Sequence, residues 1–324
     1  MRAPATPETT SSRTGAQSPI GRDGWPWSQT DESAALGVTA RREWPKISVV
    51  TATFNQGAFI EETILSVLGQ GYPNVEYIIM DGGSTDQTLD IIRKYEDRIS
   101  YWTSGPDDGA ADALRRGFQH ATGQFVAYLN SDDVYLPRTM FAAVEAFEQS
   151  GADLVFGGLY WVDTEGRLIG ERRQAACFNR GYLYGGMDIL QPASFWTRDA
   201  YERAGGIDPT FTFHFDMDLF YRMVLQGARL KPVRHYMTCF RIHPESKSST
   251  LADTYRRERD RIWQHYLDHP INSLQGRFFR NLGRLHRCLG YAVQGDLKWL
   301  LGRIPDRIRS RRSEVVVGPR TRWM

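Results

Sequence analysis

Hydrophobic residues follow two alternating patterns over the first half of the chain. A nearly continuous apolar and β-branched run over residues 46–54 is typical of a strand that is buried on both faces of a parallel sheet. Over residues 58–70, hydrophobic side chains recur every four positions, which predicts the buried face of a helix. A second apolar run over residues 76–80 predicts the next strand. This order of elements indicates a right-handed βαβ unit.

The same alternation continues as far as residue 129 and then loosens. Further helices are predicted over residues 87–95, 111–121, 199–204 and 216–226, and further strands over residues 99–103, 124–129 and 154–161. We therefore expect an α/β protein with a Rossmann-like, mostly parallel sheet that has helices on both faces. One domain over residues 45–250 is long enough to bury a core of this kind.

Residues 1–44 differ from this domain in composition. They are rich in Ser, Thr, Pro, Gly and Ala and lack the apolar segment of a signal peptide, so we expect a disordered tail. No apolar run in the chain approaches the roughly 20 residues that span a bilayer. The three cysteines, Cys177, Cys239 and Cys288, are widely spaced and form no CxxC pair, which favours a reducing compartment. We expect a cytoplasmic protein.

Basic residues are concentrated in a predicted helical extension over residues 251–324. The chain has 40 basic and 38 acidic residues, of which 12 basic and 3 acidic ones lie from Arg277 onward, so the preceding part carries a net charge of −7. One helix is expected to have arginines on one face and hydrophobic residues on the other, namely Arg277, Arg280, Arg284 and Arg287 opposite Phe278, Leu282, Leu285, Leu289 and Ala292. A second basic and apolar segment follows over residues 297–312.

Three interpretations of this extension stay open. Basic amphipathic helices bind anionic membrane surfaces, which would place the protein on the inner face of the membrane. The first helix could equally dock on the domain with its arginines in water, whereas we favour the membrane for the second segment, which Pro305 interrupts. The third interpretation is nucleic-acid binding. Because the preceding part is acidic and no aromatic or Gly-rich RNA motif accompanies the arginines, we expect no nucleic acid.

Polar and acidic residues follow three of the predicted strands. Residues 55–57, 81–86 and 130–133 each come directly after a strand, and the carboxyl ends of parallel strands meet at one edge of a sheet. In the last loop Asp132 and Asp133 stand side by side, so one carboxylate could bind a hard cation while the other contacts ribose hydroxyls or a metal-bound water. A solvated turn is the ordinary alternative for an isolated Ser-Asp-Asp triplet.

Five motifs in a fixed order decide between these alternatives. They are ISVVTATFN at residues 47–55, DGGSTD at residues 81–86, GPDDG at residues 105–109 with Asp112 and Ala113, LNSDD at residues 129–133 and GGID at residues 205–208. In these motifs the chain resembles glycosyltransferase family 2 enzymes of the GT-A fold, of the bacterial cell-surface polysaccharide type, over about residues 46–250. The resemblance implies an inverting, hexosyltransferase-like enzyme. It would move a sugar from a nucleotide sugar to a sugar or lipid-linked acceptor in cell-surface polysaccharide or glycolipid synthesis.

The resemblance also implies which residues bind the nucleotide sugar. The expected donor site consists of Thr51, Thr53, Asn55, Asp81, Gly82, Asp112, Ser131 and Asp132. Asp112 is expected either to orient the loop after Gly109 or to touch the nucleotide. Many relatives carry a second acid at the position of Gly82, and that acid makes a base contact which this chain lacks. The choice of nucleotide therefore stays open, although the resemblance favours a UDP sugar.

A divalent cation, Mn²⁺ or Mg²⁺, is implied as the cofactor, because it would neutralise a pyrophosphate leaving group. Asn130 stands where many relatives have the first Asp of a DxD triplet. The metal ligands are therefore expected to be Asp132, Asp133 and His243. For His243, a contact with a phosphate is an equal alternative.

An inverting transfer needs one carboxylate to deprotonate the acceptor hydroxyl. Relatives have a Glu-Asp pair whose Asp falls on Asp216, while Phe215 replaces the Glu, so Asp216 is the expected catalytic base. The alternative is that Asp216 and Asp218 only cap the helix that they open. The acceptor is expected to contact Gln191, Trp196 and Asp218, although Trp196 could equally pack in the core.

A sugar-phosphate nucleotidyltransferase is the competing enzyme class, since it has a similar sheet and metal-binding carboxylates. A match to that class would need a Gly-rich loop with a basic residue after the first strand. Residues 51–57 contain neither Lys nor Arg. The glycosyltransferase interpretation is therefore preferred.

Overall fold

The computed structural model describes residues 43–174, 183–184, 189–246, 251–293 and 295–296. Most of the predicted N-terminal tail, Cys177 and the second basic segment lie outside the described residues. In the described part, one sheet contains the strands β1 (Ile47–Thr53), β2 (Val75–Asp81), β3 (Tyr101–Ser104), β4 (Phe125–Tyr128), β5 (Val134–Tyr135), β6 (Leu154–Val162), β7 (Leu168–Arg172), β8 (Ser194–Thr197) and β9 (Leu230–Arg241). The order of hydrogen-bonded neighbours is β3-β2-β1-β4-β8-β6-β9-β5, and β7 pairs with β6.

Strands β1 to β4 form the parallel part of the sheet. Thr53 pairs with Asp81, and Asp81 pairs with Ser104, so the carboxyl ends of three strands lie level. Every residue of β1 except Ala52 is buried, which is why its sequence is an almost unbroken apolar and β-branched run. These four strands confirm the alternation that the hydrophobic pattern predicts.

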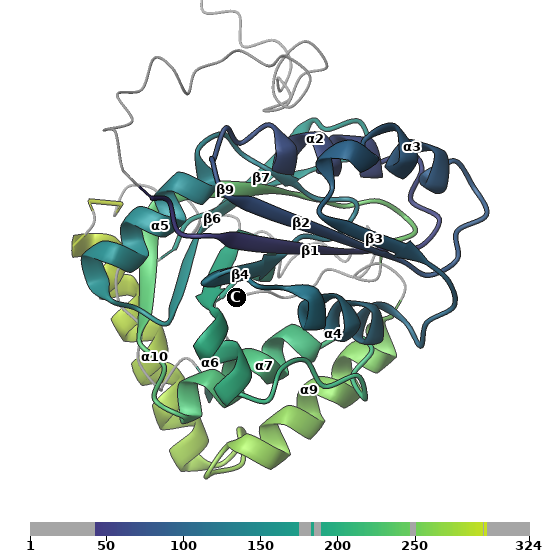
Figure 1. Ribbon diagram of the computed structural model, residues 1–324. Helices are drawn as coiled ribbons and strands as arrows, with labels where there is room; N and C mark the ends of the chain where they lie inside the picture. Colours follow the sequence, from purple (N-terminus) through teal and green to yellow (C-terminus); the bar gives the residue numbers. More distant parts are fainter. Residues whose placement is uncertain (1–42, 175–182, 185–188, 247–250, 294, 297–324) are drawn as a thin grey trace, which may run out of the picture.

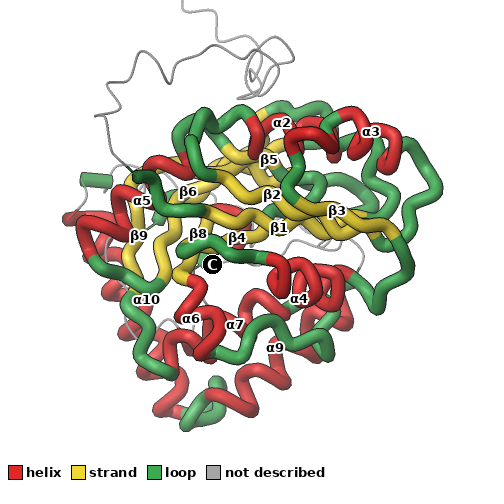
Figure 2. Tube along the Cα trace, in the orientation of Figure 1, coloured by secondary structure: helices red, strands yellow, loops and turns green. Residues whose placement is uncertain are grey.

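Helices cover both faces of the sheet, as expected (Figure 1, Figure 2). One face carries α2 (Ile60–Leu68), α3 (Thr88–Lys94) and α5 (Thr139–Ser150), and the other carries α4 (Ala110–His120), α6 (Arg198–Arg203), α7 (Phe215–Leu225) and α9 (Ala252–Tyr266). Successive side chains of β1 point to opposite faces, so Val49 packs in the core with α2 and α5 while Val50 packs in the core with α4 and α7. Among the residues that the structure describes, the connections include the short 3₁₀ turns η1 (Glu96–Arg98) and η3 (Gln191–Ala193).

The second half of the sheet is mixed rather than parallel. Strand β8 runs antiparallel to β4 and β6, and β9 runs parallel to β6 and antiparallel to β5. The hydrophobic pattern predicted neither α5, β8 nor β9. In β9 the reason is partial exposure, because Lys231, Arg234 and His235 interrupt its apolar residues. The pairing of Val134 with Cys239 brings the chain after β4 beside the end of β9.

In the described part of the chain after residue 250 there are two helices, which confirms the predicted helical extension. Helix α9 packs against the domain, since Ile262 is fully buried in the core that contains α7. The domain limits at residues 45 and 250 stay predictions, and the packing of Ile262 favours counting α9 with the domain. Within the described residues, no helix combines the length and the apolar character that a membrane span requires.

Helix α10 (Leu274–Val293) docks on the domain through a face of small residues. Gly276, Gly283 and Gly290 are buried at intervals of seven residues. Beside them the hydroxyl of Tyr291 donates to the carbonyl of Arg173 at 2.8 Å. Glycines allow a helix backbone to approach its neighbour closely, so this side of α10 is its contact face.

Five large hydrophobic residues of α10 point away from the domain. The large apolar residues between 50% and 81% exposed on this helix, here called the outer stripe, are Leu274, Phe278, Leu285, Leu289 and Val293. Arg277 and Arg284 are exposed, whereas Arg280 and Arg287 are only partly exposed. Of the two interpretations left open for this helix, the structure shows the docked one, with Arg277 and Arg284 in water. The glycine face, and not the outer stripe, makes the contact.

Candidate active site

The acidic loop after β4 meets the end of β9 at one edge of the sheet. Strand β4 ends at Tyr128, and residues 130–133 then turn into β5, which pairs with β9. The result is a short contact between Oδ2 of Asp132 and Nε2 of His243, at 3.1 Å. The Asp132 carboxylate is partly exposed and the His243 ring is buried. Two of the three predicted metal ligands are thus together.

Asp133 points away from this pair and into the protein. Its side chain is 0% exposed. Oδ1 accepts the backbone N–H of Arg241 at 3.0 Å, and Oδ2 accepts the side-chain amide of Asn130 at 3.3 Å. Burial and the neighbouring Asp132 carboxylate raise the pKa of Asp133 well above its ordinary value. The geometry does not fit the predicted metal-ligand role of Asp133, because both oxygens are occupied by groups of the protein.

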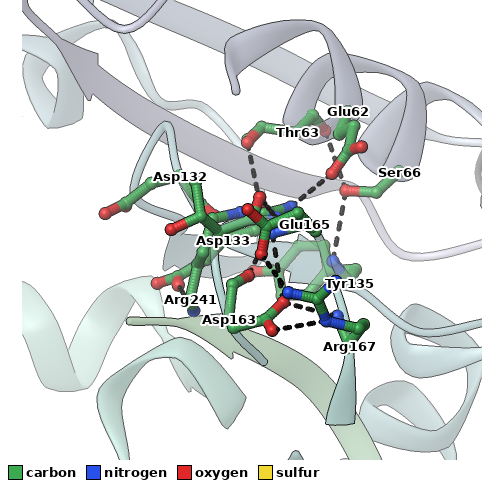
Figure 3. A network of polar contacts seen from close by, with 11 residues as sticks. Glu62, Thr63, Ser66, Asp132, Asp133, Tyr135, Asp163, Glu165, Arg167 and Arg241 are labelled. Atoms are coloured by element: carbon green, nitrogen blue, oxygen red, sulfur yellow. Dashed lines mark hydrogen bonds and ion pairs between the residues drawn. The ribbon is translucent and has the colours of Figure 1, made fainter. Parts of the chain in front are cut away.

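The buried arginine Arg241 supports the loop of residues 130–133 from the interior of the protein (Figure 3). Arg241 is 2% exposed, and its guanidinium donates to the carbonyls of Asp132 at 3.0 Å, Thr164 at 3.0 Å and Asp163 at 3.3 Å. The same guanidinium pairs with the carboxylate of Glu62. Burying a charge is costly unless it is paired and hydrogen-bonded, and the planar, five-donor guanidinium achieves both here.

The α2 helix also contributes to this support (Figure 3). The hydroxyl of Thr63 donates to the carbonyl of Asp133 at 2.8 Å, and the N–H of Tyr135 donates to Oγ of Ser66 at 3.1 Å. Asp132 therefore stands on a backbone that is fixed by α2 on one side and by Arg241 of β9 on the other. A carboxylate held in this way is preorganised for a ligand.

Several predicted donor residues hold the loops rather than face solvent. The buried carboxylate of Asp81 accepts N–H bonds from Gly83 at 3.0 Å and Ser84 at 2.9 Å and a hydroxyl bond from Ser104 at 2.6 Å. Oγ1 of Thr51 accepts the hydroxyl of Tyr77 at 3.2 Å. Asp81 therefore shapes the loops after β2 and β3, whereas Thr51 links β1 to β2, and contact of their side chains with a nucleotide is not favoured.

The remaining donor candidates differ in exposure: Asn55 is exposed and Gly82 partly exposed, whereas Thr53 and Ser131 are buried. Asn55 adopts a left-handed backbone with φ of 52°, and its Oδ1 accepts the N–H of Thr85 at 2.9 Å, which ties the loops after β1 and β2 together. Oγ1 of Thr53 is buried and has no hydrogen-bond partner among the described residues.

Asp112 opens helix α4 and is paired with that helix. Its carboxylate accepts from Arg115 at 2.7 Å and lies 3.7 Å from Arg116. The bond from Arg115 lowers the pKa of Asp112 below its ordinary value. Of the two expected roles, orientation of the loop after Gly109 is the one that these contacts support.

Asp216 lies in the first turn of α7, after a loop that α9 holds in place. The carboxylate of Glu258 accepts three consecutive N–H bonds, from Thr212 at 2.7 Å, Phe213 at 2.9 Å and His214 at 2.8 Å. Burial raises the pKa of Tyr128 well above its ordinary value, and the negative charges of Asp216 and Asp133 add to this. The ring of Phe215, the residue before Asp216, lies 5.8 Å from the ring of Tyr128, so the start of α7 packs against the last residue of β4.

The predicted acceptor residues lie in the interior. Trp196 is 0% exposed and packs among the rings of Phe118, Tyr128 and Phe220. Gln191 is buried and donates to the carbonyl of Tyr128 at 2.6 Å. The structure does not fit stacking of Trp196 on an acceptor sugar, because the ring has no accessible face. The core alternative accounts for Trp196.

Asp218 is also engaged inside the protein. Its carboxylate accepts from Nε of Arg222 at 2.9 Å and from the hydroxyl of Tyr266 at 2.8 Å. It is buried, so it links α7 to α9 and does not offer a surface to an acceptor. Asp216, which is partly exposed, is the better placed of the two acids.

Sequence reasoning missed Arg241 and Glu258 as supporting residues. Arg241 lies two positions before His243, and that spacing was the available signal. Glu258 had no local signal, because its partners lie 44 to 46 residues away in the chain. Long-range contacts of this kind appear only when the fold is known.

The Asp132 and His243 pair fits a divalent cation. A carboxylate oxygen and an imidazole nitrogen can both bind Mn²⁺, and the 3.1 Å between Oδ2 of Asp132 and Nε2 of His243 is short enough for both atoms to bind one ion. The described residues contain no group of three or more His, Cys, Asp or Glu side chains that could hold a metal ion. Further ligands would therefore come from phosphate oxygens and water, which is the usual pattern at phosphate sites.

The chain is similar in sequence to known glycosyltransferases. A family model described as glycosyl transferase family 2 matches residues 48–225. An uncharacterized glycosyltransferase of Mycobacterium tuberculosis is 32% identical over 186 residues, which cover 56% of this chain and 70% of that relative. A Bacillus subtilis protein named for teichuronic acid biosynthesis, the glycosyltransferase TuaG, is 42% identical over 92 residues, which cover 28% of this chain and 36% of TuaG.

Solved structures share the fold at lower identity. TarS 1-349 of S. aureus, in complex with UDP-GlcNAc, matches with a TM-score of 0.52 and 17% identity, over 78% of this chain and 88% of that chain. In another crystal structure of S. aureus TarS, the match covers 72% of this chain and 45% of the TarS chain. The mannosyltransferase PcManGT of Pyrobaculum calidifontis, in complex with GDP-Man and Mn²⁺, matches with a TM-score of 0.52 and 16% identity, over 81% of this chain and 79% of that chain. At these identities the likeness concerns the fold alone.

Proposed function

Since the chain belongs to glycosyl transferase family 2 and is a GT-A glycosyltransferase of the cell-surface polysaccharide type, we propose that it transfers a hexose from a nucleotide sugar to a sugar or lipid-linked acceptor with inversion. The observation that carries this proposal is the pair of Asp132 and His243 at the edge of the sheet, with Asp216 next to Phe215, whose ring packs on Tyr128 at the end of β4. We assign Asp132 and His243 to the leaving pyrophosphate and Asp216 to the attacking hydroxyl.

The proposed reaction divides the work between these residues. Asp132 and His243 would hold a divalent cation, which when bound supplies charge neutralisation for the pyrophosphate. Asp216 takes the proton from the acceptor hydroxyl as its oxygen forms a bond to the anomeric carbon. The bond from that carbon to the nucleoside diphosphate breaks on the opposite face, which inverts the configuration. General base catalysis of this kind contributes about 10²- to 10⁴-fold to a rate.

The donor is proposed to be a nucleotide sugar, with a UDP sugar as the first candidate. TarS was solved with UDP and with UDP-GlcNAc, and PcManGT with GDP-Man and Mn²⁺. These proteins share the fold of this chain, which supports the class of donor and a divalent cation as the cofactor. Neither structure assigns the base or the sugar here.

A thermal-shift panel tests this proposal. UDP, GDP, dTDP and CMP sugars are each added to the full chain with Mn²⁺ or with a chelator. One donor is expected to raise the melting midpoint in the presence of Mn²⁺, because a ligand that binds the native state stabilises it by mass action. Asp132→Asn is expected to lose the Mn²⁺-dependent part of the rise. Absence of metal-dependent stabilisation by every donor overturns the proposal.

The same preparation tests the competing enzyme class. A nucleotidyltransferase would release pyrophosphate from a nucleoside triphosphate and a sugar 1-phosphate. We expect no such release, because the loop over residues 51–57 has no Lys or Arg for the triphosphate. Pyrophosphate formation would favour the competing class.

We further propose that the protein binds the inner face of the membrane through the outer stripe of α10. The five hydrophobic side chains of the stripe are exposed together on one helix, with the exposed Arg277 and Arg284 on the same helix. Hydrophobic side chains enter the boundary of the acyl chains while arginines attract anionic headgroups. An exposed apolar patch of this kind on a monomer marks an interaction site.

Vesicle sedimentation tests the membrane surface. The full chain is expected to bind vesicles that contain anionic phosphatidylglycerol and to bind neutral phosphatidylcholine vesicles weakly. Phe278→Glu with Leu285→Glu is expected to abolish binding, whereas Ile169→Glu is the matched control, since Ile169 is also exposed but lies on β7. Unchanged binding of the double variant rejects the outer stripe as the membrane surface. A salt-dependent complex with nucleic acid instead would favour that alternative.

A further inference from the structure

Helix α9 binds the backbone before α7 with a single carboxylate. The two oxygens of Glu258 accept three consecutive N–H bonds, from Thr212 at 2.7 Å, Phe213 at 2.9 Å and His214 at 2.8 Å. Successive backbone N–H groups form a concave site for an anion, and a side chain of the protein fills this one. His214 immediately precedes α7, and its own side chain forms no capping bond. Glu258 therefore fixes the backbone at the point where α7 begins.

The same helix also holds α7 beyond Asp216 (Figure 1). The hydroxyl of Tyr266 donates to Oδ1 of Asp218 at 2.8 Å, and the Tyr266 ring lies 5.8 Å from the ring of Tyr221. Glu258 thus anchors the chain two positions before Asp216, and Tyr266 anchors it two positions after. Asp216 lies between these two contacts with α9 and is itself partly exposed. Its carboxylate projects from a fixed backbone and stays accessible.

Aromatic contacts extend the attachment of α9. The ring of Tyr255 lies 4.5 Å from the ring of His214 and 5.2 Å from the ring of Phe213. The guanidinium of Arg261 lies 4.2 Å from the ring of Phe211. The α9 residues in these contacts all lie beyond residue 225, where the match to the family model ends. An element outside that match therefore fixes the segment that leads into α7.

We propose that Glu258 is a positioning residue for the catalytic base Asp216, an inference that rests on the proposed function. A general base must lie within hydrogen-bond reach of the proton that it removes. A displacement of about 1 Å at such a group can cost about 10²-fold in rate. Because Glu258 fixes the backbone from which Asp216 projects, loss of its carboxylate is expected to displace the base while the donor loops stay in place.

A purely structural role would make Glu258 one of several groups that attach α9 to the domain. Ile262 serves for comparison, because it is fully buried on the same helix and its aliphatic side chain cannot accept N–H bonds. Ile262→Val loosens the packing of α9 and leaves the bonds to Glu258 in place. Glu258→Gln removes at least one of these bonds, since the amide nitrogen of Gln cannot accept. Both variants are expected to lower the melting midpoint, but only Glu258→Gln is expected to lower the rate.

The first experiment measures release of the nucleoside diphosphate from the donor that the thermal-shift panel selects, with Mn²⁺ and with water as the acceptor. Water loses a proton to Asp216 as its oxygen bonds to the anomeric carbon, and the bond from that carbon to the nucleoside diphosphate breaks. Glu258→Gln is expected to lower kcat by about 10- to 100-fold and to leave the donor KM within about 2-fold of the wild type. Asp260→Asn is the matched control, since Asp260 is an exposed acid on the same helix.

The second experiment tests whether Glu258 acts through Asp216. In an Asp216→Asn background, Glu258→Gln is expected to lower kcat further by less than about 2-fold, because the group that Glu258 positions is already lost. Hydrogen exchange of the full chain checks the contact itself. The amides of residues 212–214 are expected to exchange at least about 10-fold faster in Glu258→Gln than in the wild type, since a hydrogen bond to a charged group is lost.

The outcomes separate this inference from the proposed function. If Asp216→Asn turns over as fast as the wild type, or if the wild type binds no donor, the proposed function itself fails. If Asp216→Asn is slow and Glu258→Gln keeps the wild-type rate, positioning by Glu258 is rejected while the proposed function stands. Equal losses of rate in Glu258→Gln and Ile262→Val, or equal effects of Glu258→Gln with and without Asp216, also reject it, since they assign Glu258 to stability. Unchanged exchange at residues 212–214 rejects it as well.

Discussion

Two halves of the molecule build the site in different ways. The donor half, residues 47–133, places its polar residues with contacts inside neighbouring loops, such as the bonds from Gly83 and Ser84 to Asp81. The closing half, residues 134–266, places them with contacts between distant segments. The guanidinium of Arg241 reaches Glu62 across 179 positions, and Glu258 reaches His214 across 44.

The difference teaches where each function of the enzyme is encoded. Loops at parallel strand ends are specified by short motifs, so the place of these loops in the fold can be read from the sequence. The residue that we propose as the catalytic base, Asp216, follows a loop that is held by buried contacts with a distant helix. A substitution in the donor half should therefore act locally, whereas one in the closing half should also affect stability. The predictions below test that contrast, from the largest expected effect to the smallest.

Asp216 is the sharpest test of the closing half. Asp216→Asn is expected to lower kcat by about 10²- to 10⁴-fold, because the acceptor hydroxyl loses its general base. The affinity for the nucleotide donor is expected to stay unchanged, since that site belongs to the donor half. Steady-state kinetics and donor titration measure the two quantities separately. Asp253→Asn, an exposed acid in the first turn of α9, is the control. Normal kcat in Asp216→Asn would assign the base to another residue.

Arg241 tests whether the halves are joined by a buried charge. Arg241→Met is expected to lower the free energy of unfolding by about 3–5 kcal/mol, because Glu62 loses the partner of its partly buried charge and three carbonyls lose a donor. Chemical denaturation measures the change.

Arg167 is the matched control for Arg241 in the same region (Figure 3). It pairs with Asp163 and Glu165 but is 59% exposed. Arg167→Met is expected to cost under about 1 kcal/mol, as exposed pairs usually do. Equal losses in the two variants would contradict the contrast between a buried and an exposed pair. Arg241→Lys keeps the charge but not the planar fork, so it should recover only part of the loss.

The fold of the donor half could be predicted closely from its sequence. Its strands are buried on both faces and read as apolar runs, and its helices have one apolar face. Strand β9 could not be predicted, because it is partly exposed and carries charged residues. The antiparallel pairing of β8 could not be predicted either, because it is determined by contacts with β4 and β6.

The sequence predicted where the site lies in the fold, but it did not predict most of the contacts that the site residues make. Motif and strand end located Asp132, the resemblance suggested His243, and the structure brings the two together. Their neighbours required the fold. The sequence could not tell that Asp133 turns inward to Arg241 or that Trp196 fills the core, since both depend on long-range packing. Adjacent residues in one motif can face opposite sides of a loop, and Asp132 and Asp133 do so.

That opposition leads to the third prediction. Asp132→Asn is expected to weaken metal-dependent donor binding by about 10- to 100-fold, as loss of a metal ligand or of its support typically does, while leaving the melting midpoint of the free protein nearly unchanged. Asp133→Asn is expected to lower that midpoint, because the buried carboxylate accepts from Arg241 and Asn130. Thermal shift with and without Mn²⁺ and donor measures both. The reverse pattern would assign the metal to Asp133.

The smallest expected effect is the loss of folding stability at acidic pH that is caused by His214. Burial against Tyr255 lowers the pKa of His214 to about 4, below its ordinary value of 6.5, so the folded protein keeps the ring neutral. As the pH falls through 6.5, the unfolded chain binds a proton that the folded chain does not, and stability is lost until the pH reaches about 4. At pH 5.5 the loss from this residue is about 1 kcal/mol.

The variant His214→Phe removes this titration and keeps a ring against Tyr255. The free energy of unfolding is measured by denaturant at pH 7.5 and at pH 5.5, and the fall between the two is expected to be about 1 kcal/mol smaller in His214→Phe than in the wild type. His265→Phe is the control, because His265 lies exposed on α9. An unchanged fall in His214→Phe would mean that the loop before Asp216 admits a protonated ring. In that case α9 would not keep the loop packed over His214. The closing half would then depend less on distant contacts than the bonds to Glu258 indicate.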